Sequence, residues 1–367
     1  MIDKVSLSAD WLNSKQAEYK KDPSLIESMI HALYLLEQLK QTGLKFIFKG
    51  GTSLILLLEK PARFSVDIDI IVNPKIQRTE LESYLNKIVG DVFEKVELDE
   101  RRSYRGKIPK AHYKFIYKSN LVNKNQEGQV VQNLEREILL DALFAENPYP
   151  VLKEKPIDTE WIKQNGEPLT VIIPCENSIA GDKLTAYAPT TIGVPYKVEK
   201  EKEIIKQLFD IGILFENLTD IDIFRKSFHA TTTSEMNYRP ERQLTVEIVL
   251  QDIIDTGIII AKRATQGEEH AEKFEELRRG INQFGHFVYI GNFRIEEAQL
   301  AAAKAAYLAA HTLVKAEGEL KKFNPALDSK TFLIEHPEFN FLNKKLKFVA
   351  KGEALFYWNE AIKLLHP

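Results

Sequence analysis

The stretch that decides the fold covers residues 49–72 and reads KGGTSLILLLEKPARFSVDIDIIV. Two glycines near its start predict a tight turn. The apolar run after them predicts a helix over residues 53–60 that a proline ends, and the following run predicts a strand over residues 65–72. Together with a short strand-like run at residues 45–48, this order indicates an α/β fold.

The turn has the composition of a phosphate-binding loop. Gly50 and Gly51 let the backbone bend sharply and approach a phosphate closely. Thr52 opens a helix, and the N-terminal amides of a helix attract anions. Taken by itself, such a run could be an ordinary turn followed by a helix cap. We predict that it binds nucleotide through Lys49, Gly50, Gly51, Thr52 and Ser53 because of the carboxylates that follow it.

Two of these carboxylates lie on the predicted strand. Residues two apart on a strand point to the same face, so Asp67 and Asp69 should project together. Their charges favour a divalent cation, and oxygen ligands beside a triphosphate suit Mg²⁺. An isolated Asp-x-Asp pair usually lies on a solvated strand face. Its combination with the glycine turn favours a phosphate-binding loop beside a metal site.

These motifs carry a resemblance to a known group of enzymes. Gly51-Thr52 followed by Asp67-Ile68-Asp69 resembles the signature of the polymerase-beta-like nucleotidyltransferase superfamily. With Lys49 and the run RFSVDID, the chain more closely resembles the AbiEii/AbiGii toxin family, which includes the MenT toxins. The resemblance covers roughly residues 25–215. It implies a nucleotidyltransferase domain with a small mixed sheet, which transfers a nucleoside monophosphate from an NTP.

The resemblance also implies an essential helical lysine, followed along the chain by an aspartate. The run ENSIAGDKLTA places the lysine at Lys183, and KQLFDI places the aspartate at Asp210. The family pattern has Arg-Asp shortly before that aspartate, where this chain has Lys206-Gln207. Lys206 keeps a positive charge for phosphate binding but loses the bidentate fork of arginine. Without the resemblance, Lys183 would usually be interpreted as a solvated helical lysine, and Asp210 could be a surface aspartate.

A third carboxylate beside the pair is a further implication of this fold. The strand predicted over residues 134–144 offers Glu135, Glu137 and Asp141. Asp141 is flanked by apolar residues, and a buried carboxylate is unfavourable without a partner such as a metal. We therefore choose Asp141 as the third metal ligand and general base, with Glu137 on the same alternating face as the alternative.

The rest of the chain separates into two parts. Strands and helices interleave to about residue 150, beginning with a helix over residues 24–41 whose capping box pairs Ser24 with Glu27. A proline-rich connecting segment follows over residues 145–170. Helical periodicity then covers residues 176–187, 199–216, 240–264, 268–283, 294–317 and 353–365. We predict a nucleotidyltransferase domain over 1–170 and a mostly α-helical domain over 171–367, whose first helices (176–215) complete the active site.

A basic strip runs over residues 101–118 with the sequence RRSYRGKIPKAHYKFIYK, which holds seven Lys or Arg and no acid. Four aromatic residues are interleaved with the charges: Tyr104, Tyr113, Phe115 and Tyr117. Such a strip suits an RNA backbone and stacked bases. It is equally typical of a half-buried strand whose alternate aromatic residues face the core.

Composition excludes several classes of protein. The 367 residues carry a net charge of −3, so the chain has no general basic coat for nucleic acid. One cysteine excludes an intramolecular disulfide and a Cys-rich zinc site, and the scattered histidines show no metal-ligand spacing. There is no P-loop, and neither a signal peptide nor a membrane span is indicated. We expect a cytoplasmic protein.

The acceptor of the transferred nucleotide stays open at this point. In the MenT branch it is the 3′ end of tRNA, and the family implies a cognate antitoxin and a role in phage defence. The alternatives are an enzyme that modifies a protein or a small molecule, because a fold does not choose its acceptor, and a non-catalytic nucleotide-binding scaffold.

Overall fold

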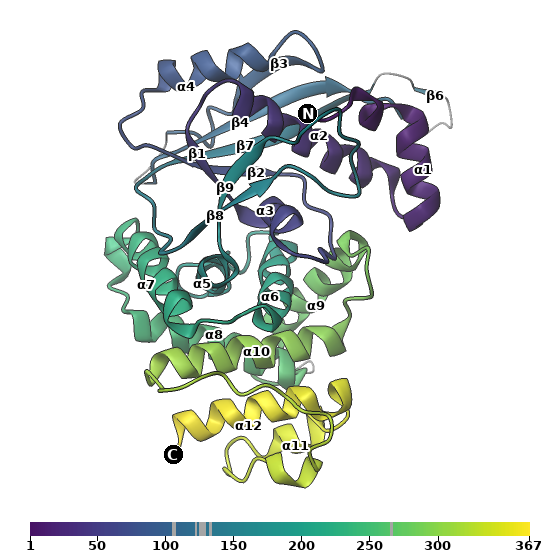
Figure 1. Cartoon of the computed structure of the whole chain (residues 1–367). Helices are drawn as coiled ribbons and strands as arrows, with labels where there is room; N and C mark the ends of the chain where they lie inside the picture. Colours follow the sequence, from purple (N-terminus) through teal and green to yellow (C-terminus); the bar gives the residue numbers. More distant parts are fainter. Residues whose placement is uncertain (105–107, 122, 125–129, 132–133, 265–266) are drawn as a thin grey trace. The chain divides into compact units, whose positions relative to one another are not determined.

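The computed structural model describes residues 1–104, 108–121, 123–124, 130–131, 134–264 and 267–367. The chain divides into two compact units, which we describe separately (Figure 1). The first unit consists of Met1–Asn147 and Leu152–Cys175, and the second of Pro148–Val151 and Glu176–Pro367. Strands occur in the first unit, whereas the described part of the second is built from helices and loops. The predicted fold class, an α/β part followed by a mostly helical part, is confirmed.

A five-stranded mixed sheet organises the first unit. Its order is β1-β2-β7-β4-β3, and only the β2–β7 neighbours run parallel. The strands are β1 (Phe46–Lys49), β2 (Ile68–Val72), β3 (Phe93–Leu98), β4 (Lys110–Lys118) and β7 (Glu135–Phe144). The strands expected at 110–118 and 134–144 are confirmed, whereas β3 was not predicted.

Shorter elements complete this unit. Its helices are α1 (Ala9–Tyr19), α2 (Pro23–Gln41), α3 (Gly50–Leu57) and α4 (Arg78–Leu85), with 3-10 turns at Lys4–Leu7 and Asn86–Ile88. Two antiparallel ladders join β5 (Asn123–Lys124) to β6 (Val130–Val131) and β8 (Leu152–Pro156) to β9 (Thr170–Pro174). The proline-rich segment over 145–170 is therefore not only a connection, because it contains β8.

The basic strip is largely a half-buried strand. Tyr113, Phe115 and Tyr117 on β4 have exposed fractions of 2%, 0% and 0%, so they pack in the core and are not available to stack on bases. Only Tyr104 is exposed, and Arg105 and Lys107 lie outside the described residues. On the outer side, Lys114 pairs with Glu137 at 3.0 Å and Lys118 with Glu94 at 2.6 Å. The expectation of an aromatic RNA platform here is wrong for the three buried rings.

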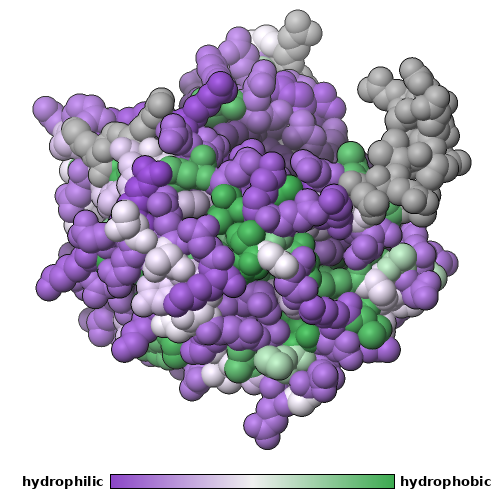
Figure 2. All heavy atoms as spheres, turned by 90° about the horizontal axis from the view of Figure 1, so that it is seen from above, coloured by the Kyte–Doolittle hydropathy of each residue, from purple (hydrophilic) through white to green (hydrophobic). Residues whose placement is uncertain are grey.

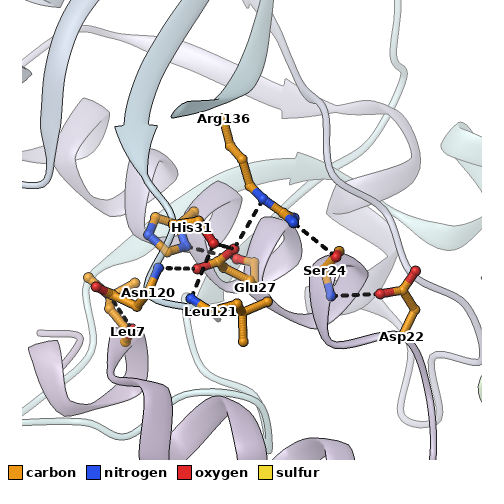
Figure 3. A network of polar contacts seen from close by, with 9 residues as sticks. Leu7, Asp22, Ser24, Glu27, His31, Asn120, Leu121 and Arg136 are labelled. Atoms are coloured by element: carbon orange, nitrogen blue, oxygen red, sulfur yellow. Dashed lines mark hydrogen bonds and ion pairs between the residues drawn. The ribbon is translucent and has the colours of Figure 1, made fainter. Parts of the chain in front are cut away.

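Helix α2 begins as expected, but its cap differs from the prediction. Asp22 caps the helix by accepting a hydrogen bond from the amide of Ser24 at 2.8 Å. Glu27 is fully buried and accepts from the Ser119 hydroxyl at 2.7 Å and the Asn120 amide at 2.8 Å, as Figure 3 shows. Arg136 of β7 lies 3.5 Å from the same carboxylate. The predicted Ser24–Glu27 capping box is wrong, because Glu27 joins α2 to Arg136 of β7 and to the loop that follows β4.

The second unit is assembled around α10 (Ile295–Leu313). This helix packs against α6 (Glu201–Glu216), α8 (Val246–Lys262) and α12 (Glu353–Leu365). Most of the alanine-rich face of α10 is fully buried, and small side chains let the neighbouring helices approach closely. The other helices are α5 (Glu176–Ala186), α7 (Ile221–Asn237), α9 (Ala271–Phe284) and α11 (Phe341–Leu346). Short 3-10 turns lie at Pro240–Arg242, Gly285–Phe287, Ser329–Phe332 and Val349–Gly352. Helices α7 and α11 were not predicted.

One face of the molecule is mainly polar. Figure 2 shows one face on which hydrophilic residues cover most of the area, with hydrophobic residues in smaller groups between them. Within the described part of the chain, no helix combines the length and the apolar character needed to cross a membrane.

Candidate functional site

A polar row crosses four strands of the sheet in the first unit. Lys49 on β1 lies opposite Asp69 on β2, and Asp69 lies opposite Asp141 on β7. Asp141 in turn lies opposite His112 on β4. Directly opposite residues of neighbouring strands point to the same face of a sheet, so these four side chains form one row. All four are half-buried, which leaves them accessible to a ligand.

The glycine turn lies directly beside this row. Gly50 has a φ of +78°, in the left-handed region that favours glycine, and a Cβ there would collide with the Asp69 carboxylate. A Cβ on Gly51 would collide with the Arg63 guanidinium and lie 2.8 Å from the Ser65 hydroxyl. Gly50 therefore requires glycine, whereas a side chain at Gly51 would displace Arg63 and Ser65. The two residues also begin α3, which starts at Gly50 instead of the predicted residue 53.

The next two hydroxyls fix the start of α3 to the segment before β2. The Thr52 hydroxyl donates to the Asp67 carbonyl at 2.6 Å and lies 2.9 Å from the Ser65 hydroxyl. The Ser53 hydroxyl donates to the Gly50 carbonyl at 2.9 Å. Both side chains are fully buried. We infer that any contact of Thr52 and Ser53 with a phosphate uses their backbone amides.

Asp67 lies just outside the strand on which it was predicted. Strand β2 begins at Ile68, three residues later than the expected start, so Asp69 alone of the pair is a strand residue. Because the Thr52 hydroxyl binds the Asp67 carbonyl, the Asp67 backbone is tied to α3. Asp67 is half-buried like Asp69.

The register distinguishes between the two candidates for the third carboxylate. Pairing of β2 with β7 begins at Ile68 opposite Leu140, which places Asp141 beside Asp69. Glu137 lies before that point on β7, and it is exposed and paired with Lys114 at 3.0 Å. Asp141 is therefore better placed than Glu137 to share a ligand with Asp69.

His112 is the member of the row that sequence reasoning missed. Its Nδ1 lies 2.6 Å from Oδ1 of Asp141, and the Arg102 guanidinium lies 3.9 Å from Oδ2. The spacing of the histidines along the chain gives no sign of a metal site. In the sequence, His112 is recognisable only as a polar residue in an alternating strand pattern. Its position beside Asp141 becomes evident only once the β4–β7 register is known.

The carboxylates suit Mg²⁺ in their chemistry. No group of three or more His, Cys, Asp or Glu side chains is arranged to hold a metal among the residues that the structure describes. Mg²⁺, however, usually takes one or two protein carboxylates and completes its shell with water and substrate phosphates. Asp69 and Asp141 in adjacent register, with Asp67 beside them along the chain, supply that donor set.

The second unit holds the other predicted pair. Nζ of Lys183 on α5 lies 2.9 Å from Oδ2 of Asp210 on α6, and the two side chains are 6% and 1% exposed. Lys183 also donates to the Gln207 side chain at 3.2 Å. Asp182, its sequence neighbour, instead accepts from Tyr149 at 2.7 Å. Lys183 is therefore not a solvated helical lysine, and Asp210 is not a surface aspartate.

The departure from the family pattern has a structural counterpart in the same place. Gln207, which stands where the pattern has an aspartate, accepts the hydrogen bond from Lys183. Lys206 is half-buried and lies 3.6 Å from Glu203 on its own helix. It stays a prediction that these residues of the second unit complete a site with the polar row of the first unit: Lys183, Asp210 and Lys206.

Comparison with known proteins places the chain in a family. A family model for nucleotidyl transferase AbiEii toxins of type IV toxin–antitoxin systems matches residues 34–287, more than half of the chain. The match continues past residue 215, where the recognised motifs ended, and takes in α7, α8 and α9. No curated protein matches the chain. With the glycine turn and the carboxylates inside the matched region, the chain belongs to the AbiEii nucleotidyltransferase toxin family.

Proposed function

We propose that the protein uses Mg²⁺ to transfer a nucleoside monophosphate from an NTP to the 3′ end of tRNA. The observation that supports this most strongly is the adjacent register of Asp69 and Asp141, directly beside the Gly50-Gly51 turn. A nucleotidyltransferase needs a phosphate-binding loop beside metal-binding carboxylates, and the glycine turn next to Asp69 and Asp141 would supply both.

In this proposal each residue of the first unit has a distinct task. The amides at the start of α3 donate to phosphate oxygens of the NTP. Asp67, Asp69 and Asp141 would hold Mg²⁺, which supplies positive charge to the reacting phosphates. One oxygen of Asp141 is held by His112, and the other can accept the proton of the acceptor hydroxyl. That hydroxyl oxygen bonds to the α-phosphorus as the bond to pyrophosphate breaks.

Lys183 would act on the leaving group. A lysine ammonium is a compact point charge that binds phosphate oxygens and stabilises charge that grows on pyrophosphate. Asp210 and Gln207 hold the ammonium in place at 2.9 and 3.2 Å. This role requires the second unit to present Lys183 to the nucleotide, which is part of the proposal.

A transfer assay tests the function. Each of the four NTPs, labelled at the α-phosphate, is incubated with deacylated tRNA and the protein, with Mg²⁺ or with EDTA. We expect one or more nucleotides to label tRNA only when Mg²⁺ is present. Transfer RNA whose 3′ ribose has been oxidised with periodate is the control, and it should stay unlabelled.

Other outcomes of the same assay contradict the proposal. Label in protein, when total protein replaces tRNA, would assign a protein acceptor, and label in a small molecule would assign a modifying enzyme. No label with any acceptor, while NTP still binds, would indicate a non-catalytic nucleotide-binding scaffold. Label that persists in EDTA would remove Mg²⁺ from the reaction.

The cellular setting follows from the family. Membership of a toxin–antitoxin family implies an antitoxin partner for this chain. Because tRNA is used in the cytoplasm, we place the reaction there. We further propose that the toxin serves phage defence and that its antitoxin restrains it in uninfected cells.

A further inference from the structure

A turn near the end of the second unit exposes an aromatic ring among lysines. We call residues 344–351 the Lys–Phe turn; it consists of the end of α11 and most of the segment that leads to α12. Phe348 in this turn is 85% exposed, more than any other large hydrophobic side chain among the described residues. A single exposed ring is common on protein surfaces, so its meaning depends on the residues around it.

The exposure of Phe348 is imposed by an ordered backbone. Leu346 and Val349, on either side of it, are 0% and 7% exposed and anchor the turn in the core. Ala350 and Lys351 have φ values of 48° and 57°, a left-handed conformation that non-glycine residues rarely adopt. The ring is therefore held outward between two anchors and does not belong to a frayed end.

The lysines around the ring are not neutralised. Lys344, Lys345, Lys347 and Lys351 are all exposed, and none forms an ion pair with any residue in the described part of the chain. Lys304 in the same unit shows the contrast, because it is buried and pairs with Glu216 at 2.6 Å and Glu353 at 3.1 Å. The ammonium of Lys347 lies 5.5 Å from the centre of the Phe348 ring. The turn thus presents one ring surrounded by uncompensated positive charge.

We infer that the Lys–Phe turn binds RNA, with phosphates on the lysines and a base stacked on Phe348. A flat ring combined with positive charges is the arrangement with which proteins hold single-stranded nucleic acid without reading its sequence. A lipid surface fits less well, because Leu342 and Leu346 of α11 are both buried and leave no apolar helix face to insert. The inference rests on the proposed function in one respect, since it takes RNA as the acceptor class.

Binding by the full-length protein to deacylated tRNA and to a short single-stranded RNA tests this inference. Phe348→Ala should weaken binding about 5- to 150-fold, the range expected for loss of one stacked base. Phe348→Trp should restore it, whereas Phe348→Leu should not. Lys344→Gln, Lys345→Gln and Lys347→Gln together should lower the salt slope of binding by about two, because three fewer counterions are released.

A matched variant controls for the loss of charge itself. Lys20, Lys226 and Lys315 are exposed lysines elsewhere on the chain. Changing these three to Gln removes the same total charge and should leave the salt slope nearly as in the unchanged protein. An equal effect of both triple variants would overturn the inference, as would unaltered RNA binding in Phe348→Ala. Phe348-dependent binding to phosphatidylserine vesicles without RNA binding would assign the turn to a membrane.

The failure of this inference can be told apart from failure of the proposed function. If the unchanged protein labels tRNA and Phe348→Ala labels and binds it equally well, the function stands and the turn has no part in it. If RNA binding depends on Phe348 but no nucleotide is transferred, the turn binds RNA and the proposed reaction is wrong. Transfer in which Phe348→Ala raises the KM for tRNA without changing the KM for NTP supports both.

Discussion

The carboxylates of the first unit and the Lys183–Asp210 pair of the second were both predicted to serve one active site, yet they lie in opposite environments. Asp67, Asp69 and Asp141 are half-buried, the last two on the interior strands β2 and β7 and the first just before β2. Lys183 and Asp210 lie between helices α5 and α6 with side chains 6% and 1% exposed. Both sets are charged, but only the first retains contact with water.

This difference separates chemistry from stability. A half-exposed carboxylate keeps part of its hydration, so its removal changes what the site can bind more than how firmly the unit folds. A buried charge has lost its hydration, and only its partner offsets that loss. Variants of the first set should therefore affect activity alone, and variants of the second should affect activity and stability together.

The largest effect that the comparison predicts is loss of activity in the first unit. Asp67→Asn or Asp69→Asn should lower nucleotide transfer by about 10³-fold or more, because a metal ligand and its charge are lost. The melting temperature should change little. Glu137→Gln is the matched control on the outer face of β7, since Glu137 is exposed and pairs only with Lys114 in the described structure, and it should retain activity. A strongly destabilised Asp69→Asn protein would break the distinction between the two regions.

The buried pair should show the opposite balance. Lys183→Met leaves the Asp210 carboxylate without its partner in the core, which should destabilise the protein by about 3–5 kcal/mol as well as abolish transfer. The double variant Lys183→Met with Asp210→Leu removes both charges and should recover most of that stability without recovering activity. Thermal or urea unfolding of the full-length protein measures the stability of both variants, and the transfer assay measures their activity.

Lys206→Met is the control for this pair. Lys206 lies half-buried on the same helix as Asp210 and contacts Glu203 at 3.6 Å, so its loss should change stability by less than about 1 kcal/mol. If Lys183→Met is as stable as Lys206→Met, the Lys183–Asp210 ion pair does not contribute to stability. If the double variant regains transfer, Lys183 has no catalytic part.

Much of the difference between the half-buried carboxylates and the buried Lys183–Asp210 pair could not be predicted from the sequence. The motif around Gly50 and Asp69 could be found because its residues are close along the chain and each has a local meaning. The burial of Lys183 could not, because α5 has polar residues on most of its faces and its periodicity does not show which one α6 covers. Glu27 is a similar case, since a local capping pattern hid a buried contact with residues more than 90 positions away.

Register is the second quantity that sequence patterns could not supply. The alternation in β7 places Asp141 and Glu137 on the same face equally well. Only the pairing of β7 with both β2 and β4 shows that Asp141 has Asp69 on one side and His112 on the other. Such pairing depends on contacts across many residues, and no short-range pattern encodes it.

The smallest predicted effect tests whether the polar row acts as a unit. His112 contacts Asp141 at 2.6 Å and is a positioning residue in our proposal. His112→Leu removes the hydrogen bond and should lower Mg²⁺ affinity or transfer by about 10- to 100-fold, as is typical when a partner of a metal ligand is lost. His112→Asn can still donate a hydrogen bond from nearly the same place as Nδ1 and should retain most of the function.

The measurement is the transfer rate as a function of Mg²⁺ concentration. Loss of a positioning residue should raise the Mg²⁺ concentration required more than it lowers the rate at saturating Mg²⁺. Equal defects in both variants with an unchanged Mg²⁺ requirement would show that His112 serves only the packing of β4. The accessible row would then end at Asp141.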